Sequence, residues 1–129
     1  MHDIKKKEVW FVDYPYEDNP DLSKVRPVVV LDVIEDNLEV LSVKVTSKPP
    51  RTDNDVLDFY EVPLFDWQKA NLSKPSVARI SKITLVQRDA FLERIGIVSE
   101  KDWNNIKKKA RQFFKELSPE NEEENDRGR

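Results

Sequence analysis

The chain has 129 residues, enough for one domain that buries a core without disulfides, and it contains no cysteine. Thiolate metal sites and cysteine nucleophiles are therefore excluded, and a single histidine, His2, leaves no partner for serine–histidine or paired-histidine catalysis. The two glycines are too few for glycine-rich phosphate loops or dinucleotide-binding motifs.

Charge is distributed unevenly along the chain. Charged residues make up 36% of the sequence and the formal net charge is −3. Residues 118–129 hold five acidic and two basic side chains, which accounts for the whole net charge, so we expect a disordered acidic tail there. Residues 1–117 are neutral, which argues against polyanion binding through overall charge but permits local basic patches. Without an apolar stretch of 18 residues or a signal-peptide pattern, the sequence predicts a soluble, cytoplasmic protein with no membrane segment.

The first third of the chain predicts three strands. Residues 8–14 (EVWFVDY) are aromatic and β-branched, as strands are. A polar loop over 15–25 follows, and then an apolar strand over 28–34. The turn at 35–37 joins this strand to a partner over 38–47, which predicts a hairpin.

The middle of the chain alternates polar loops with short strands. After a loop at 49–55, residues 58–65 predict a short strand that Pro63 places at a sheet edge. Residues 66–71 predict one helical turn, and residues 76–86 predict a longer strand.

The last part of the domain predicts a helix. A helical turn at 87–91 and a short strand at 92–98 lead to Ser99, which caps a helix that extends to residue 117, with Asp102 at the capping-box position. Apolar residues recur at helical spacing and form one stripe, made of Trp103, Ile106, Ala110, Phe113, Phe114 and Leu117. Five or six short strands with tight connections and one terminal helix predict a mainly β fold, a small antiparallel barrel, in a single domain over residues 1–117.

Polar side chains that interrupt the apolar strands are candidates for a site. Ser42, Lys44 and Thr46 share one face of their strand, because side chains alternate. Arg79 lies between apolar neighbours, and an unpaired buried arginine is costly. Arg79 is therefore either paired with a carboxylate or directed into a groove.

The long loop at 15–25 offers further candidates. Arg26 lies where the loop enters the buried strand, and it either binds loop carbonyls or belongs to a site. Tyr14 and Tyr16 flank the loop as candidates for base stacking, and a carboxylate of the loop, such as Glu17, could act as a general base.

The order EVWFVDYP, polar loop, RPVVVLDV, hairpin, KVTS, SVARISKI and terminal helix resembles the MazF/PemK family of toxin endoribonucleases over residues 7–117. The resemblance implies the SH3-like barrel that plasmid-maintenance toxins such as Kid and CcdB share. It also implies a homodimer and metal-independent cleavage of single-stranded RNA. Because the sequence has no cysteine, one terminal histidine and no clustered metal-ligand motif, we expect no cofactor and attack by the RNA's own 2′-hydroxyl, which yields a 2′,3′-cyclic phosphate and a 5′-hydroxyl. The partner implied besides RNA is an antitoxin peptide that occupies the RNA groove.

The resemblance also assigns roles to residues. Arg26 matches the arginine that binds the scissile phosphate, Thr46 the threonine that supports it, and Arg79 a catalytic arginine of Kid-like members. Glu17 could supply the base. Candidate RNA contacts are Tyr16, Lys24, Lys44, Lys48 and Ser81.

Ser81 supports a second hypothesis. It stands where Kid-like members carry an aspartate, so the carboxylate of that position is missing. The alternative is therefore a catalytically degenerate SH3-like module that binds nucleic acid or a protein partner.

Overall fold

The computed structural model describes residues 3–15, 23–34, 38–47 and 60–117. Within them a single antiparallel sheet has the strand order β4-β5-β3-β2-β1-β6. Its strands are β1 (Glu8–Pro15), β2 (Ser23–Ile34), β3 (Glu39–Thr46), β4 (Glu61–Pro63), β5 (Val77–Gln87) and β6 (Phe91–Ile97). A 3-10 turn, η2 (Arg88–Ala90), joins β5 to β6, and the chain continues into α1 (Glu100–Leu117).

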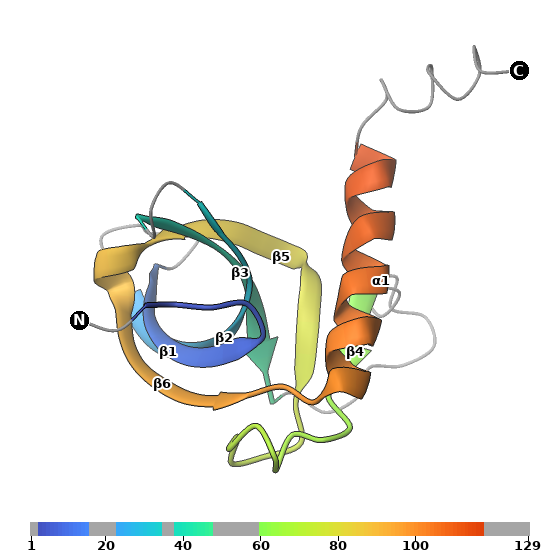
Figure 1. Cartoon of the computed structure of the whole chain (residues 1–129), viewed down its shortest axis with the longest axis horizontal. Coiled ribbons are helices and arrows are strands. Elements are labelled where there is room, and N and C mark those ends of the chain that lie inside the picture. Colours follow the sequence, from blue (N-terminus) through green and yellow to red (C-terminus); the bar gives the residue numbers. More distant parts are fainter. Residues whose placement is uncertain (1–2, 16–22, 35–37, 48–59, 118–129) are drawn as a thin grey trace, which may run out of the picture.

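The sheet curls strongly on itself, and α1 stands beside β4 and β5 (Figure 1). The predicted mainly β, antiparallel architecture with a C-terminal helix is confirmed. Among the described strands, no hydrogen-bonded ladder joins β6 to β4, so the barrel-like curl stays open between its two edge strands.

The main departure from the predicted strands is the start of β2. We expected a polar loop up to residue 25, but β2 begins at Ser23 and pairs with β1 from Pro15↔Ser23 onward. Polar residues such as Lys24 extend the ladder because backbone pairing does not depend on side-chain polarity. Arg26 therefore lies inside a strand, opposite Val12, and not at a loop end.

The β2–β3 hairpin and the edge position of Pro63 are confirmed. The β5 ladder contains an irregularity that the sequence did not predict. Val43 pairs with Ile83, but the next residue on β3, Lys44, pairs with Arg79, so the three residues from Ile80 to Lys82 have no directly opposite partner. Such a bulge bends the strand, and β5 turns sharply near α1 in Figure 1.

The helix begins where predicted, with Ser99 as its cap, but the side chain of Asp102 has a different role from the predicted one. Ser99 accepts a hydrogen bond on its Oγ from the Asp102 amide, at 3.2 Å. The carboxylate of Asp102 does not close a capping box. It is buried and accepts hydrogen bonds from the backbone amides of Phe65 and Asp66, at 3.0 and 2.8 Å. Asp102 thus fastens the helix to the segment after β4, where the predicted turn at 66–71 lies.

Two apolar clusters lie on the two faces of the sheet. The first contains Trp103, Ile106 and Ala110 of α1 packed on residues such as Val45 and Ala78. The second lies on the other face and contains Trp10, Val12, Tyr14, Val28, Val30, Val40, Val86 and Phe91. The predicted helix stripe is confirmed for its first half. Phe114 and Leu117 are exposed, because the last turns of α1 extend past the sheet (Figure 1).

None of the helices in the described part of the chain has the length and apolarity that crossing a membrane requires.

Candidate functional site

Strand register brings the predicted cations onto one face of the sheet. Directly opposite residues of antiparallel strands place their side chains on the same face. One row of such partners crosses five strands, in the order Trp10, Val28, Lys44, Arg79 and Glu61. Trp10 and Val28 belong to the cluster on the face away from α1, so the charged members of the row lie on that face too.

The next residues toward the end of the sheet extend the same face. Arg26 is two residues before Val28, and Thr46 is two residues after Lys44, so both share the face with the row. Lys24 follows one step further, opposite Tyr14. We call Lys24, Arg26, Lys44 and Arg79 the cationic cluster.

Arg26 and Thr46 are both half-buried. Within the described part of the chain, no carboxylate forms an ion pair with Arg26. One interpretation of Arg26 was a loop arginine that binds loop carbonyls. Because Arg26 is part of strand β2, that interpretation no longer applies. An arginine at the end of a sheet, half exposed and without a carboxylate beside it, is suited to bind an external anion.

Lys44 is held by an aromatic ring. Its Nζ lies 5.7 Å from the centroid of the Tyr14 ring, a cation–π distance. Tyr14 itself is buried, and its hydroxyl donates a hydrogen bond to the Lys82 carbonyl at 3.4 Å. The suggestion that Tyr14 stacks on a base is therefore wrong, because its ring is enclosed by the apolar cluster and Lys44.

Arg79 forms the ion pair that its apolar surroundings require. Its Nε lies 3.4 Å from Oε2 of Glu61, and both side chains are buried. The contact is electrostatic, because the Nε–H is not aligned on an acceptor as a hydrogen bond. Of the two interpretations left open for Arg79, a paired arginine is what the structure contains; its predicted catalytic role remains a prediction.

A pocket of about 300 Å³ lies at the end of the sheet next to the cationic cluster. Lys24, Arg26 and Thr46 line it, and the segment before β5 contributes polar groups from Asn71, Ser73, Lys74 and Ser76. Residues of the opposite face line it as well, such as Val45 of β3 and Phe11 of β1, so the pocket wraps around the strand ends.

Several predicted site residues are not part of this arrangement. Tyr16, Glu17 and Lys48 lie outside the described residues. Ser81 lies in the irregular stretch of β5 and has no directly opposite partner on β3. The structure therefore assembles Lys24, Arg26, Lys44, Thr46 and Arg79, and it leaves the predicted base unplaced.

Sequence reasoning missed Glu61, Asn71 and Lys74. Glu61 belongs to a three-residue strand. The alternation of polar Glu61 with apolar Val62, next to Pro63, is the sequence pattern that could have indicated which face Glu61 occupies. Asn71 and Lys74 belong to the turn segment before β5, and no periodicity marks residues that reach a pocket from a turn.

A larger pocket, of about 610 Å³, lies elsewhere and is lined by Asp3, Lys5, Glu8, Trp10, Leu92, Glu93 and Arg94. Its central carboxylate, Glu8, is already bound by the Lys5 amide, the Trp10 indole and Arg94. None of the predicted site residues lines it, so the cationic cluster remains the candidate site. Within the described residues, no three His, Asp or Glu side chains are grouped so that they could hold a metal ion.

A family model described as "PemK-like, MazF-like toxin of type II toxin-antitoxin system" matches residues 5–114. The chain belongs to this family. The toxin is also similar in fold to solved structures. One is an endoribonuclease in complex with its cognate antitoxin from a mycobacterial species, at 14% identity and a TM-score of 0.60, covering 83% of this chain and 90% of that chain.

Two more solved structures have the same fold. An endoribonuclease from a mycobacterial species has 13% identity to the toxin and a TM-score of 0.60, with 85% of this chain and 89% of that chain covered. The Mycobacterium tuberculosis toxin MazF-mt6 has 16% identity and a TM-score of 0.57, with 83% and 95% covered. Among curated proteins, the sequence matches none.

Proposed function

We propose that this toxin is an endoribonuclease that cleaves single-stranded RNA with the cationic cluster. The observation that carries the proposal is the register that places Arg26, Lys44 and Thr46 on one face at the end of the sheet. An RNA backbone presents a phosphate at each nucleotide, and clustered cations beside a pocket that combines polar and apolar side chains suit such a ligand. Membership of the PemK-like, MazF-like toxin family supports the same activity.

The chemistry that suits these residues is attack by the RNA itself. The ribose 2′-hydroxyl is the nucleophile, and it attacks the adjacent phosphorus while the bond to the 5′-oxygen of the next nucleotide breaks. Arg26 donates to the phosphoryl oxygens and stabilises the charge that develops on them, and Thr46 supports that contact. The departing 5′-oxygen takes up a proton from the protonated base or from water, so the products are a 2′,3′-cyclic phosphate and a 5′-hydroxyl. Glu17 is the candidate for the base that removes the 2′-hydroxyl proton.

The remaining parts of the proposal concern binding. Lys24, Lys44, Lys48, Ser81 and Tyr16 contact the RNA, and Arg79 takes part in catalysis. The toxin acts in the cytoplasm as a homodimer, and an antitoxin peptide inhibits it by occupying the RNA groove. One of the solved structures with the same fold is an endoribonuclease in complex with its cognate antitoxin, which supports the antitoxin part. Equilibrium sedimentation tests the dimer: we expect twice the protomer mass at micromolar concentration, and a purely monomeric protein would contradict it.

End-group analysis of the products tests the reaction. The toxin should cleave a mixed single-stranded RNA in excess EDTA and leave a 5′-hydroxyl on the downstream product. An RNA with a 2′-deoxyribose before the scissile phosphate should bind but stay intact, because its nucleophile is missing. A 5′-phosphate product, or activity restored by magnesium alone, would contradict this mechanism.

A second candidate function is a degenerate binding module. Within the described chain, register places one carboxylate at this end of the face, Glu61, and Arg79 already pairs with it. A protein whose base is missing would bind RNA through the cationic cluster without cleaving it. Its signature is salt-sensitive RNA binding with every substrate left intact, because each phosphate contact releases counterions.

A further inference from the structure

The ion pair between Arg79 and Glu61 is buried inside the proposed site. The two residues are direct partners on β5 and β4, and the side chains are 8% and 10% exposed. Glu61 comes from a strand of three residues, and among the described strands β4 pairs with β5 alone. A three-residue edge strand adds few backbone hydrogen bonds to the sheet, and this one places a carboxylate against Arg79.

Glu61 offsets charge repulsion within the cationic cluster. Arg79 has Lys44 as its direct partner on β3, on the side opposite to Glu61. Like charges directly opposite each other across a ladder destabilise it, and a buried guanidinium without a counterion is costly. The carboxylate of Glu61 supplies that counterion from the outer side and allows Arg79 to stay beside Lys44.

The contact engages one end of the guanidinium. The Nε of Arg79 lies 3.4 Å from Glu61, and within the described residues the two terminal amino groups have no hydrogen-bond partner. These two groups form the planar fork that binds phosphate oxygens in a bidentate manner. A guanidinium anchored through Nε is restricted in rotation, and its fork is pre-oriented.

We propose that Glu61 is a positioning residue of the RNA-cleaving site, which anchors Arg79 beside Lys44 so that its fork meets the phosphate in the transition state. The role rests on the proposed function. Glu61 is assigned no contact with RNA, because its carboxylate pairs with the guanidinium of Arg79. It acts through orientation, so its loss lowers kcat and leaves KM nearly unchanged, since Lys24, Arg26 and Lys44 still bind the RNA backbone.

The test compares kcat, KM and the thermal midpoint of unfolding for the full-length wild type, Glu61→Gln and Glu61→Asp, on a short RNA that the wild type cleaves. Glu61→Gln removes the charge at nearly constant volume, and we expect kcat to fall about ten- to a hundredfold with KM within about twofold of wild type. Glu61→Asp keeps the charge and should recover part of kcat. Asp102→Asn is the matched control: another buried carboxylate outside the cationic cluster, which should lower the midpoint without lowering kcat.

The possible results separate the hypotheses. A folded Glu61→Gln with wild-type kcat and a lowered midpoint would overturn the positioning role and leave a structural ion pair. If Glu61→Gln does not fold, Glu61→Asp decides alone, because a shortened anchor should lower kcat in a folded protein, and a wild-type kcat there would overturn the proposal. A wild type that cleaves no RNA would overturn the endoribonuclease function and the positioning role together.

Discussion

Gly96 on β6 lies against the backbone of Ala70 so closely that no other residue fits there. A Cβ on Gly96 would overlap the Ala70 carbonyl and lie 2.7 Å from its carbon atom. The neighbouring Asn71 has a left-handed backbone, with φ of 64°, and its side-chain amide donates to the Ile95 carbonyl at 2.7 Å. These contacts fasten the turn that carries one wall of the pocket to the strand beside it.

Gly96→Ala is therefore expected to destabilise the toxin. The obstacle is backbone, which cannot rotate aside as a side chain does, so we expect a loss of about 1–3 kcal/mol in the free energy of unfolding. Urea denaturation followed by circular dichroism measures it. Glu93→Ala, an exposed change on the same strand, should stay within about 0.5 kcal/mol of wild type. An unchanged midpoint for Gly96→Ala would show that the turn moves away from β6 freely.

Asp102→Ala should cost more stability than loss of the helix cap. Its carboxylate is fully buried and accepts from two backbone amides of the segment after β4, so its removal leaves both donors unsatisfied and costs about 2–3 kcal/mol. Ser99→Ala removes one capping acceptor and should cost about 1 kcal/mol. Denaturation curves of the two variants rank the effects, and the reverse order would show that Asp102 does not fasten the helix to this segment.

Arg26→Ala should lower RNA cleavage while the protein remains folded. Loss of a charge-assisted phosphate contact in the transition state costs about 2–4 kcal/mol, or about 30- to 1,000-fold in rate. Arg26→Lys keeps the charge but loses the fork, so we expect cleavage to fall while RNA binding survives.

The matched control for Arg26 is Arg111→Ala, which removes the same charge from an exposed position on α1. Initial rates on one RNA, with circular dichroism spectra for each variant, provide the comparison. Cleavage at the wild-type rate by a folded Arg26→Ala would remove Arg26 from the catalytic residues.

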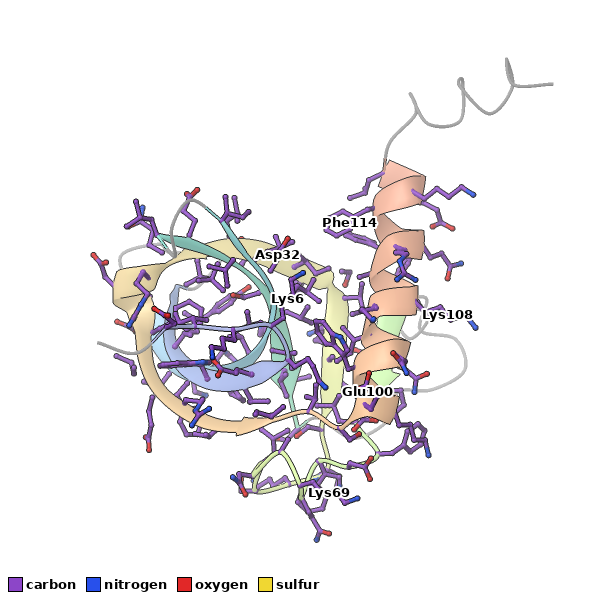
Figure 2. All side chains as sticks on the ribbon, viewed as in Figure 1. Lys6, Asp32, Lys69, Glu100, Lys108 and Phe114 are labelled. Carbon is purple, nitrogen blue, oxygen red and sulfur yellow. The ribbon has the colours of Figure 1, made fainter. Side chains whose placement is uncertain are left out.

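Lys7 and Glu100 connect the segment before β1 to the first turn of α1. Lys7 Nζ donates to Glu100 Oε1 at 2.8 Å, and Figure 2 shows Glu100 at the base of the helix. This hydrogen bond, and then the charge of Lys7, hold the pKa of Glu100 below its ordinary value. A lowered folded-state pKa means that the pair stabilises the protein above the ordinary carboxyl pKa, and that this stabilisation is lost as the pH falls through the folded-state value.

Lys7→Met should therefore raise the pKa of Glu100 toward its ordinary value and weaken the dependence of stability on pH in the acidic range. Carboxyl titration by NMR measures the shift. Lys6→Met is the control, because Lys6 pairs with Asp32 at 3.8 Å and should leave Glu100 unaffected. A Glu100 titration that is the same in Lys7→Met and wild type would show that the ion pair does not form in solution.

Local sequence patterns predicted most of the strands and the helix. They could not predict the register in which distant strands pair. The alternation in residues 38–47 predicted which face Lys44 and Thr46 share, and Pro63 predicted an edge strand. The partner of Arg79 could not be predicted from the sequence. Glu61 reaches Arg79 because β4 pairs with β5, and the sequence contains many other acidic residues that could have been its partner. The irregular stretch of β5 from Ile80 to Lys82 likewise results from the fit between whole strands and has no signature in its own residues.

The sheet joins strands from opposite ends of the described chain, since β1 lies between β2 and β6. The β2–β3 hairpin that carries Arg26 and Thr46 needs only local chain to form, whereas β1 gains its second neighbour, β6, some eighty residues after it is synthesised. Pairings so distant in sequence form late in folding, because loop closure precedes the contacts that offset its entropic cost. A ribosome making this toxin therefore extends the chain past β6 before the sheet can be completed. The toxin therefore cannot acquire the contact between β1 and β6, which completes the row of strands, until β6 itself has been synthesised.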